Sequence, residues 1–148
     1  MARSSVATLT LQDVVDILDK VQSLKFMDRA VWEAIGEQLT IIHKKRYEQE
    51  IDPDGNAWTP LNEKYQAKKK EKANYQKILQ YSGRLFDTLH AQASDYGVKF
   101  GSNSVYAATQ HYGRDGIPAR QIIGINEADK KIIAEEVIEA YVNWLSAQ

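Results

Sequence analysis

The sequence predicts an α+β fold: N-terminal helices, a small antiparallel β-sheet in the second half, and a C-terminal helix. Apolar residues recur every three to four positions over residues 8–50 and 126–145, the period of an amphipathic helix. Between them, residues 90–101 alternate apolar and polar side chains around a turn signal, which indicates paired strands. A length of 148 residues, 43% of them hydrophobic, suits a single domain over 1–148 with one core.

The first helix is predicted over residues 8–24, because Thr10 can cap it and Asp13 lies three residues later, close to a capping-box pattern. Its apolar stripe consists of Leu11, Val14, Val15, Leu18 and Val21 or Leu24. The second helix is predicted over residues 28–50 with Asp28 as its N-cap. Its core face consists of Ala30, Val31, Ala34, Ile35, Leu39, Ile42 and Tyr47.

Gly36 lies inside the second helix, where glycine costs about 1 kcal/mol relative to alanine, so we expect a close helix contact there. Pro53 and Gly55 end this helix, since proline lacks an N–H donor and glycine accepts positive φ. Asn62 then caps a short third helix that runs to about residue 72. Residues 73–81 are expected to be a loop or an extension of that helix.

The second half begins with the chain break Ser82-Gly83, followed by a short helical or extended piece at 84–88. Residues 90–94 and 97–101 flank the turn signal Asp95-Tyr96-Gly97 and predict an antiparallel hairpin.

The remaining elements are a short helix over 103–112, a loop over 113–118, a third short strand over 121–124 and a last helix over 126–145. Asn126 caps the last helix. Its apolar face is formed by Ile132, Ile133, Val137, Ile138, Tyr141 and Leu145.

The chain contains no cysteine, which excludes a disulfide framework, thiol catalysis and thiolate metal sites, and fits a reducing compartment. No apolar run approaches the roughly 18 residues of a membrane span, and residues 1–11 do not read as a signal peptide. We therefore expect no membrane partner.

The formal net charge of −1 conceals an uneven distribution. Residues 1–60 carry 7 basic and 10 acidic groups, residues 61–84 carry 7 and 2, and residues 85–148 carry 5 and 8. A basic middle segment between two acidic flanks indicates a contact surface.

Asp52, Asp54, Asn56 and Glu63 occupy positions 1, 3, 5 and 12 of a loop between helices, which is the ligand spacing of an EF-hand calcium site. Position 6, where that motif needs glycine, is Ala57. The alternative, which we favour, is a turn that ends a helix, with no metal and no cofactor.

The histidines His43, His90 and His111 have no spacing typical of a helical metal site, and no Gly-x-Ser-x-Gly motif is present. His43, beside two lysines, is expected at the surface. A small hydrolase built around His90 or His111 stays open as a third class of function, since catalytic triads are spatial.

The basic segment is interleaved with Tyr65, Tyr75 and Tyr81. Its cations are Lys64, Lys68, Lys69, Lys70, Lys72, Lys77 and Arg84. Lysine and arginine neutralise phosphates and tyrosine stacks on bases, so nucleic-acid binding is one interpretation. A solvated helix face or the contact surface for an acidic protein is the other, and we prefer it.

Four segments together resemble the phage virion morphogenesis family, the tail-completion proteins of Mu-like and related tailed phages and prophages. We number these motifs first to fourth: 54–61 (DGNAWTPL), 78–85 (ILQYSGRL), 105–113 (VYAATQHYG) and 117–124 (IPARQIIG). The resemblance covers about residues 45–125, with an N-terminal helix in 1–25 outside it and the C-terminal helix in 126–148. His111 stands one place later than in the family pattern, and residues 121–123 replace a more aromatic run.

Most motif residues are expected to keep the fold, because glycine permits special backbone geometry and tryptophan packs. They are Gly55, Trp58, Pro60, Leu61, Gly83, Leu85, Tyr106, Ala107, Gly113, Pro118 and Arg120. Arg120 is also a candidate for a bidentate carboxylate contact within or between subunits, so it joins the seven basic-segment residues as a candidate interface residue.

The resemblance implies a non-enzymatic virion assembly protein, acting in tail completion and head–tail joining. It implies self-association into a homo-oligomer, in a ring, and docking to tail tube, terminator or neck proteins. The location implied is the tail or head–tail junction of the virion, reached by assembly in the bacterial cytoplasm. The alternative is a nucleic-acid-binding module that uses residues 64–84.

Overall fold

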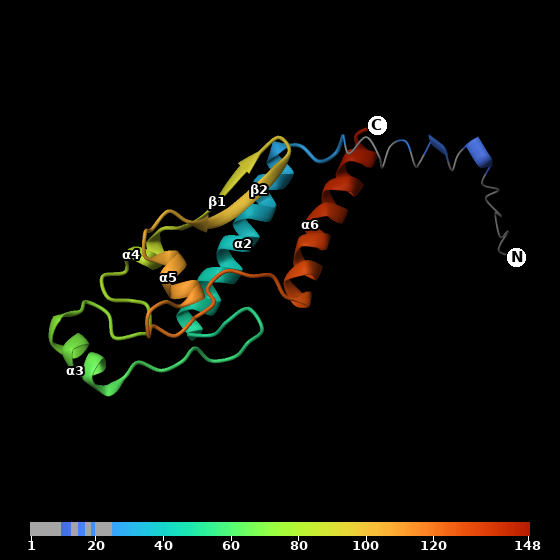
Figure 1. The fold of residues 1–148 in the computed structure, drawn as a ribbon. Helices are drawn as coiled ribbons and strands as arrows, with labels where there is room; N and C mark the ends of the chain where they lie inside the picture. The colour runs from blue at the N-terminus through green and yellow to red at the C-terminus, as the bar shows by residue number, and fades with distance from the viewer. Residues whose placement is uncertain (1–9, 13–14, 17–18, 20–24) are drawn as a thin grey trace, which may run out of the picture.

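The computed structural model describes residues 10–12, 15–16, 19 and 25–148. The predicted α+β class is confirmed: the chain has helices, a two-stranded antiparallel sheet and a C-terminal helix. Helix α2 (Arg29–Gln49) is the central element (Figure 1). The hairpin of β1 (Leu89–Ser94) and β2 (Gly97–Ser102) packs on one side of it, and α6 (Glu127–Ser146) packs on another (Figure 1).

The helix predicted over residues 8–24 lies largely outside the described residues. Those that are described there and have helical backbone are Leu11, Gln12, Val15, Asp16 and Asp19.

Helix α2 begins as predicted, since the Asp28 side chain accepts a hydrogen bond from the Val31 N–H. It ends at Glu50, whose φ of 58° is left-handed. A close contact is present at Gly36, but its partner is a strand and not another helix: a Cβ atom there would lie 2.9 Å from the Cβ of Ala91 in β1. Glycine therefore lets the hairpin approach α2 closely.

Helix α3 (Glu63–Lys72) is capped by the Asn62 side chain, which accepts from the Tyr65 N–H as predicted. Within α3, all of which is described, Lys69 alone is buried. The helix therefore has no apolar face, and in Figure 1 it lies at the lower edge of the molecule, away from α6.

The predicted hairpin is confirmed, with Leu89 opposite Ser102 and Ser94 opposite Gly97. The short helix α4 (Arg84–Asp87) leads into it. The buried core lies at the end of α2 where these segments meet. It consists of Tyr47, Trp58, Leu89 and Ile122, with Ile78, Leu79, Leu85, Phe86, Phe100 and Ile123 packed around them.

Helix α5 (Ala107–Tyr112) is shorter than the predicted 103–112. The third strand predicted at 121–124 is wrong, because this stretch has no strand partner. Histidine rings, not a neighbouring strand, accept its backbone N–H groups, as described below. Helix α6 agrees with the prediction within one residue at each end.

Candidate functional site

The first and fourth motifs lie side by side although they are far apart in the chain. The Trp58 indole Nε1 donates to the carbonyl oxygen of Gln121 at 2.9 Å. The buried guanidinium of Arg120 donates from Nε to the Thr59 oxygen at 2.7 Å and from Nη2 to the Pro60 oxygen at 3.2 Å. The fork of Arg120 therefore binds two successive backbone carbonyls of its own chain, not the carboxylate that the sequence suggested.

Burial lowers the pKa of the Arg120 guanidinium, and nearby Tyr65 opposes this shift. Arginine stays protonated in proteins, so the group remains a buried cation satisfied by carbonyl dipoles. Arg120 is 5% exposed and its contacts lie within one chain, which was one of the two expected alternatives, so its role at an interface between subunits stays a prediction.

The loop before Trp58 is shaped by Asp52, which closes it on itself. Oδ1 of Asp52 accepts from the N–H groups of Asp54 (2.9 Å) and Asn56 (2.8 Å), and Oδ2 accepts from Nδ2 of Asn56 (3.2 Å). Gly55 supplies the positive φ of 87°. This is the local carboxylate turn that Asp and Asn favour, and it points Trp58 into the core.

The calcium pattern is not assembled as a site. The carboxylate of Asp52 is engaged by its own loop, and the Asn56 amide donates to it. Glu63 lies in the first turn of α3. In the described part of the chain, no group of three or more His, Cys, Asp or Glu residues could hold a metal ion.

The third motif joins the same junction through α5. The Arg120 N–H donates to the Gln110 oxygen at 2.8 Å, and the Ile122 N–H donates to Nδ1 of His111 at 3.1 Å. Gly113 follows with φ 74°. A Cβ atom at Gly113 would lie 2.7 Å from the carbonyl oxygen of Ile117, so only glycine fits this close approach.

The second motif reaches the junction through Tyr47 of α2. The Tyr47 hydroxyl donates to the Leu79 carbonyl at 2.6 Å, and burial raises the pKa of this phenol. Its ring packs edge-on against Trp58 (centroids 5.1 Å apart) and Phe86 (5.4 Å). All four motifs therefore meet around one core, which we call the motif junction.

Two histidines from different helices hold residues 122–124. His43 of α2 accepts the Gly124 N–H at Nε2 (3.2 Å), and its Nδ1 lies 2.6 Å from the Leu39 carbonyl. Only a neutral ring with the proton on Nδ1 satisfies both contacts. Burial lowers the pKa of His43 and of His111, and the charge of Arg46 lowers that of His43 further. The prediction that His43 is at the surface is wrong: 1% of it is exposed.

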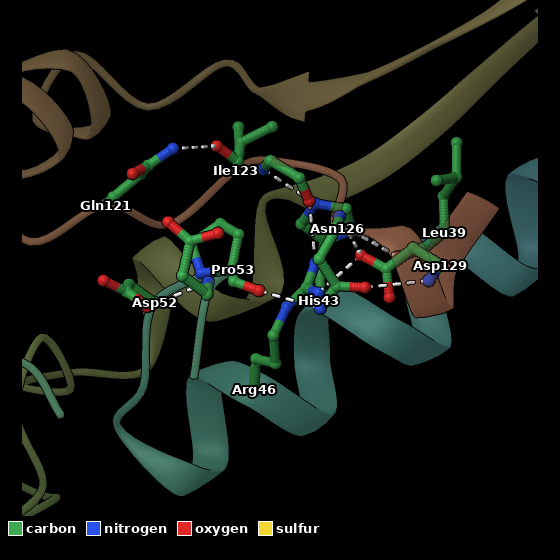
Figure 2. A network of polar contacts seen from close by, with 11 residues as sticks. Leu39, His43, Arg46, Asp52, Pro53, Gln121, Ile123, Asn126 and Asp129 are labelled. Atoms are coloured by element: carbon green, nitrogen blue, oxygen red, sulfur yellow. Dashed lines mark hydrogen bonds and ion pairs between the residues drawn. The ribbon is translucent and has the colours of Figure 1, made fainter. Parts of the chain in front are cut away.

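A buried ion pair lies beside His43 (Figure 2). Arg46 Nη1 contacts Asp129 Oδ2 at 2.6 Å, and Nη2 donates to the Gly124 oxygen at 2.8 Å. The backbone N–H of Asn126 donates to Asp129 Oδ2, and Asn126 Nδ2 donates to the Pro53 oxygen at 2.8 Å. The capping box that begins α6 therefore also anchors it to α2 and to the loop of the first motif.

Arg46 and Asp129 were not singled out from the sequence. Arg46 lies at helical spacing from Ile35, Leu39 and His43 on the buried face of α2. This spacing could have predicted that Arg46 is buried. Its Nε atom finds no acceptor among the described residues.

The histidines do not form a catalytic arrangement among the described residues. His90 is exposed, with Nδ1 2.9 Å from the Thr88 carbonyl. His111 borders an open hollow of about 550 Å³ that Asp52 and Tyr112 also line. Because Nδ1 of His111 already accepts backbone N–H groups, that nitrogen is not available as a general base.

The basic segment divides into exposed cations and one buried lysine. Lys69 is buried, and its ammonium donates to the Lys77 carbonyl. Burial lowers the pKa of Lys69, and the charge of Glu50 opposes this. As a surface contact, the prediction for Lys69 is wrong. The exposed members, which we call the basic surface, are Lys64, Lys68, Lys70, Lys72, Lys77 and Arg84.

Tyr65, Tyr75 and Tyr81 are exposed within the same segment. The Tyr75 ring also covers Gly83, where a Cβ atom would lie 3.0 Å from the ring. Among the described residues, no helix is long and apolar enough to cross a membrane.

These features define a small α+β protein, in which the motif residues meet around one core and the charged groups of α3 other than Lys69 face solvent. Residues 9–143 match the model of the phage virion morphogenesis family, so the chain belongs to this family. The match extends beyond the motif region 45–125 and includes most of residues 8–24, which lie outside the four motifs. No curated protein and no solved structure matches the chain. The protein therefore has a structural or assembly role in a phage virion.

Proposed function

We propose that the protein acts in tail completion at the head–tail junction, without catalysis, by self-association into a ring and by docking to tail tube, terminator or neck proteins. The observation that carries this proposal is the division between the buried motif junction and the basic surface. The motif residues stabilise the fold, while six cations of one segment remain exposed.

Charge complementarity supports contact between copies. The exposed face of α2 carries Glu33 and Glu37, and that of α6 carries Glu135 and Glu139. Basic and acidic surfaces on separate elements of one chain suit a head-to-tail contact, which closes into a ring when the rotation permits.

Light scattering over a series of protein and salt concentrations tests self-association. The triple variant Lys64→Glu, Lys68→Glu, Lys70→Glu should weaken association, and association of the wild type through the basic surface should weaken as salt rises. A matched variant, Lys45→Glu, Lys99→Glu, Arg114→Glu, makes the same charge change at exposed positions outside the basic surface and should retain it. A wild-type protein that is monomeric under every condition would contradict the proposal.

A second candidate function is nucleic-acid binding, favoured by the exposed rings of Tyr65, Tyr75 and Tyr81 among the lysines. It predicts an affinity for single-stranded or duplex DNA that falls steeply with salt. Fluorescence anisotropy with labelled oligonucleotides measures this, and the absence of binding at low salt removes the candidate.

A further inference from the structure

Helix α6 exposes a row of branched apolar side chains on one face. Ile138, Val142 and Leu145 are 61%, 51% and 42% exposed, at positions i, i+4 and i+7. Another face of the helix contacts α2, where Gln38 Nε2 donates to Glu136 Oε1 at 3.0 Å. We call the exposed row the α6 stripe. Helix α6 and the hairpin lie on different sides of α2 (Figure 1).

A second exposed apolar row lies near the N-terminus. Leu11 and Val15 have helical backbone, are four residues apart and are 81% and 40% exposed. Gln12 Nε2 donates to Asp16 Oδ1 at 2.8 Å, an i,i+4 contact on the polar side of the same turns. The sequence continues this row through Val14, Leu18, Val21 and Leu24.

The chain that follows this segment is attached beside the α6 stripe. The ring of Phe26 packs edge-on against Tyr141 (centroids 5.2 Å apart) and lies 6.5 Å from the ring of Trp144. Phe26 therefore joins the N-terminal part of the sequence to the body at the last turns of α6. Each copy thus carries one apolar row in the N-terminal segment and one on α6.

We propose that residues 8–24 of a second copy pack as an amphipathic helix on the α6 stripe. A helix of 17 residues is about 25 Å long, which exceeds the roughly 10 Å between Ile138 and Leu145. The occupant is taken from a second copy because, within one chain, both Leu11 and the α6 stripe stay exposed, so neither covers the other.

This inference rests on the proposed self-association and names one of its contacts. Each copy carries one segment and one stripe, so the contact can be reciprocal in a dimer or repeated around a ring. It is apolar, whereas the contact proposed for the basic surface is ionic. The two contacts therefore differ in their salt dependence, since high salt weakens the ionic contact by screening and leaves the apolar contact intact.

Crosslinking tests the contact directly, because the chain contains no other thiol. Val15→Cys and Ile138→Cys are purified as separate full-length proteins, mixed and treated with a short bismaleimide linker. A peptide joining positions 15 and 138 can then form only between two molecules. The matched control replaces Val15→Cys with Tyr96→Cys, a 93% exposed position at the hairpin turn. We expect the 15–138 peptide in at least tenfold excess over the 96–138 peptide.

Sedimentation velocity of Ile138→Asp and Val142→Asp supplies the second readout. Both sites are exposed, so the monomer should fold, and thermal melts verify this. Association should weaken about tenfold or more per substitution, given the apolar area withdrawn from contact. Tyr96→Asp should associate as the wild type does.

The outcomes separate the two proposals. If the wild type self-associates but 15–138 crosslinks are absent between molecules, or Ile138→Asp associates normally, the inference is wrong and the proposed self-association stands. If the double variant Val15→Cys, Ile138→Cys crosslinks only within one molecule, the segment covers its own α6 and the inference is also wrong. A wild type that never associates removes both.

Discussion

Arg46 of α2 and Asp129 of α6 form a buried ion pair, with Nη1 and Oδ2 2.6 Å apart and the two side chains 9% and 6% exposed. The same carboxylate accepts the Asn126 N–H in the capping box of α6. One acidic group therefore both begins a helix and fixes that helix to the centre of the fold.

Replacing Asp129→Ala should destabilise the protein by about 3–5 kcal/mol, because it leaves the Arg46 cation buried without its partner. Urea unfolding followed by circular dichroism measures this. Glu127→Ala is the control, since it removes an exposed pair with Lys130 on the same turn and should cost about 0–1 kcal/mol. A loss below about 1 kcal/mol for Asp129→Ala would contradict the expectation.

Stability should fall on mild acidification because of His43 and His111. The folded pKa of each ring is lowered below 6.5 by burial, so the unfolded chain binds more protons in this range. The stabilisation is present above pH 6.5 and is lost as the pH falls from there towards the lowered folded pKa, by at most about 1.4 kcal/mol per pH unit and histidine. Chemical unfolding at pH 7.5, 6.5 and 5.5 gives the slope.

The variant His43→Gln should flatten this dependence, whereas His90→Gln, at an exposed position, should leave it unchanged. An equal slope in His43→Gln and the wild type would show that His43 is not the titrating group.

Gly113→Ala should be far more damaging than Gly116→Ala. Both glycines have positive φ, 74° and 86°, so both substitutions carry backbone strain of about 1–2 kcal/mol. Only at Gly113 does the added Cβ meet backbone, at 2.7 Å from the Ile117 oxygen and 2.8 Å from the Ala119 nitrogen, whereas Gly116 has open space. We expect a further 1–3 kcal/mol at Gly113. Similar melting temperatures for the two variants would argue against a tight approach there.

Arg120→Lys should destabilise by about 1–3 kcal/mol, since lysine cannot reproduce the fork that binds the Thr59 and Pro60 carbonyls. Arg114→Lys, at an exposed site, should be nearly neutral. Denaturant midpoints compare the two. If Arg120→Lys kept full stability but lost self-association, Arg120 would have the interface role that its burial argues against.

Local signals predicted most of the fold. The side chains of Asp28, Asn62 and Asn126 cap their helices as expected, because capping depends on residues within one turn. The hairpin was equally local, since its turn and its alternation lie within about 12 residues.

The errors arose where distant residues decide the outcome. Residues 121–124 have the apolar composition of a strand, but His43 and His111 accept their N–H groups. The burial of His43 depends on Phe100 of β2, whose ring stacks on it with centroids 4.2 Å apart. Neither Phe100 nor the N–H of Gly124, the two partners of His43, can be predicted from the residues next to position 43.

The site was predictable in part. The motif residues were identified, and among them Trp58 lies in the core and Gly113 at a close backbone approach. The partners of Arg120 were not predictable, because carbonyls of residues 59 and 60 carry no sequence signature.

The burial pattern of α3 has a consequence for sequence divergence. Since Lys69 is the one residue of this fully described helix that enters the interior, the other nine positions tolerate exchange at little thermodynamic cost. The motif junction has less freedom, because Trp58, Arg120 and His111 are each matched to particular carbonyl or N–H groups. The charges of α3 can therefore change when a binding partner changes, without altering the fold that positions the helix.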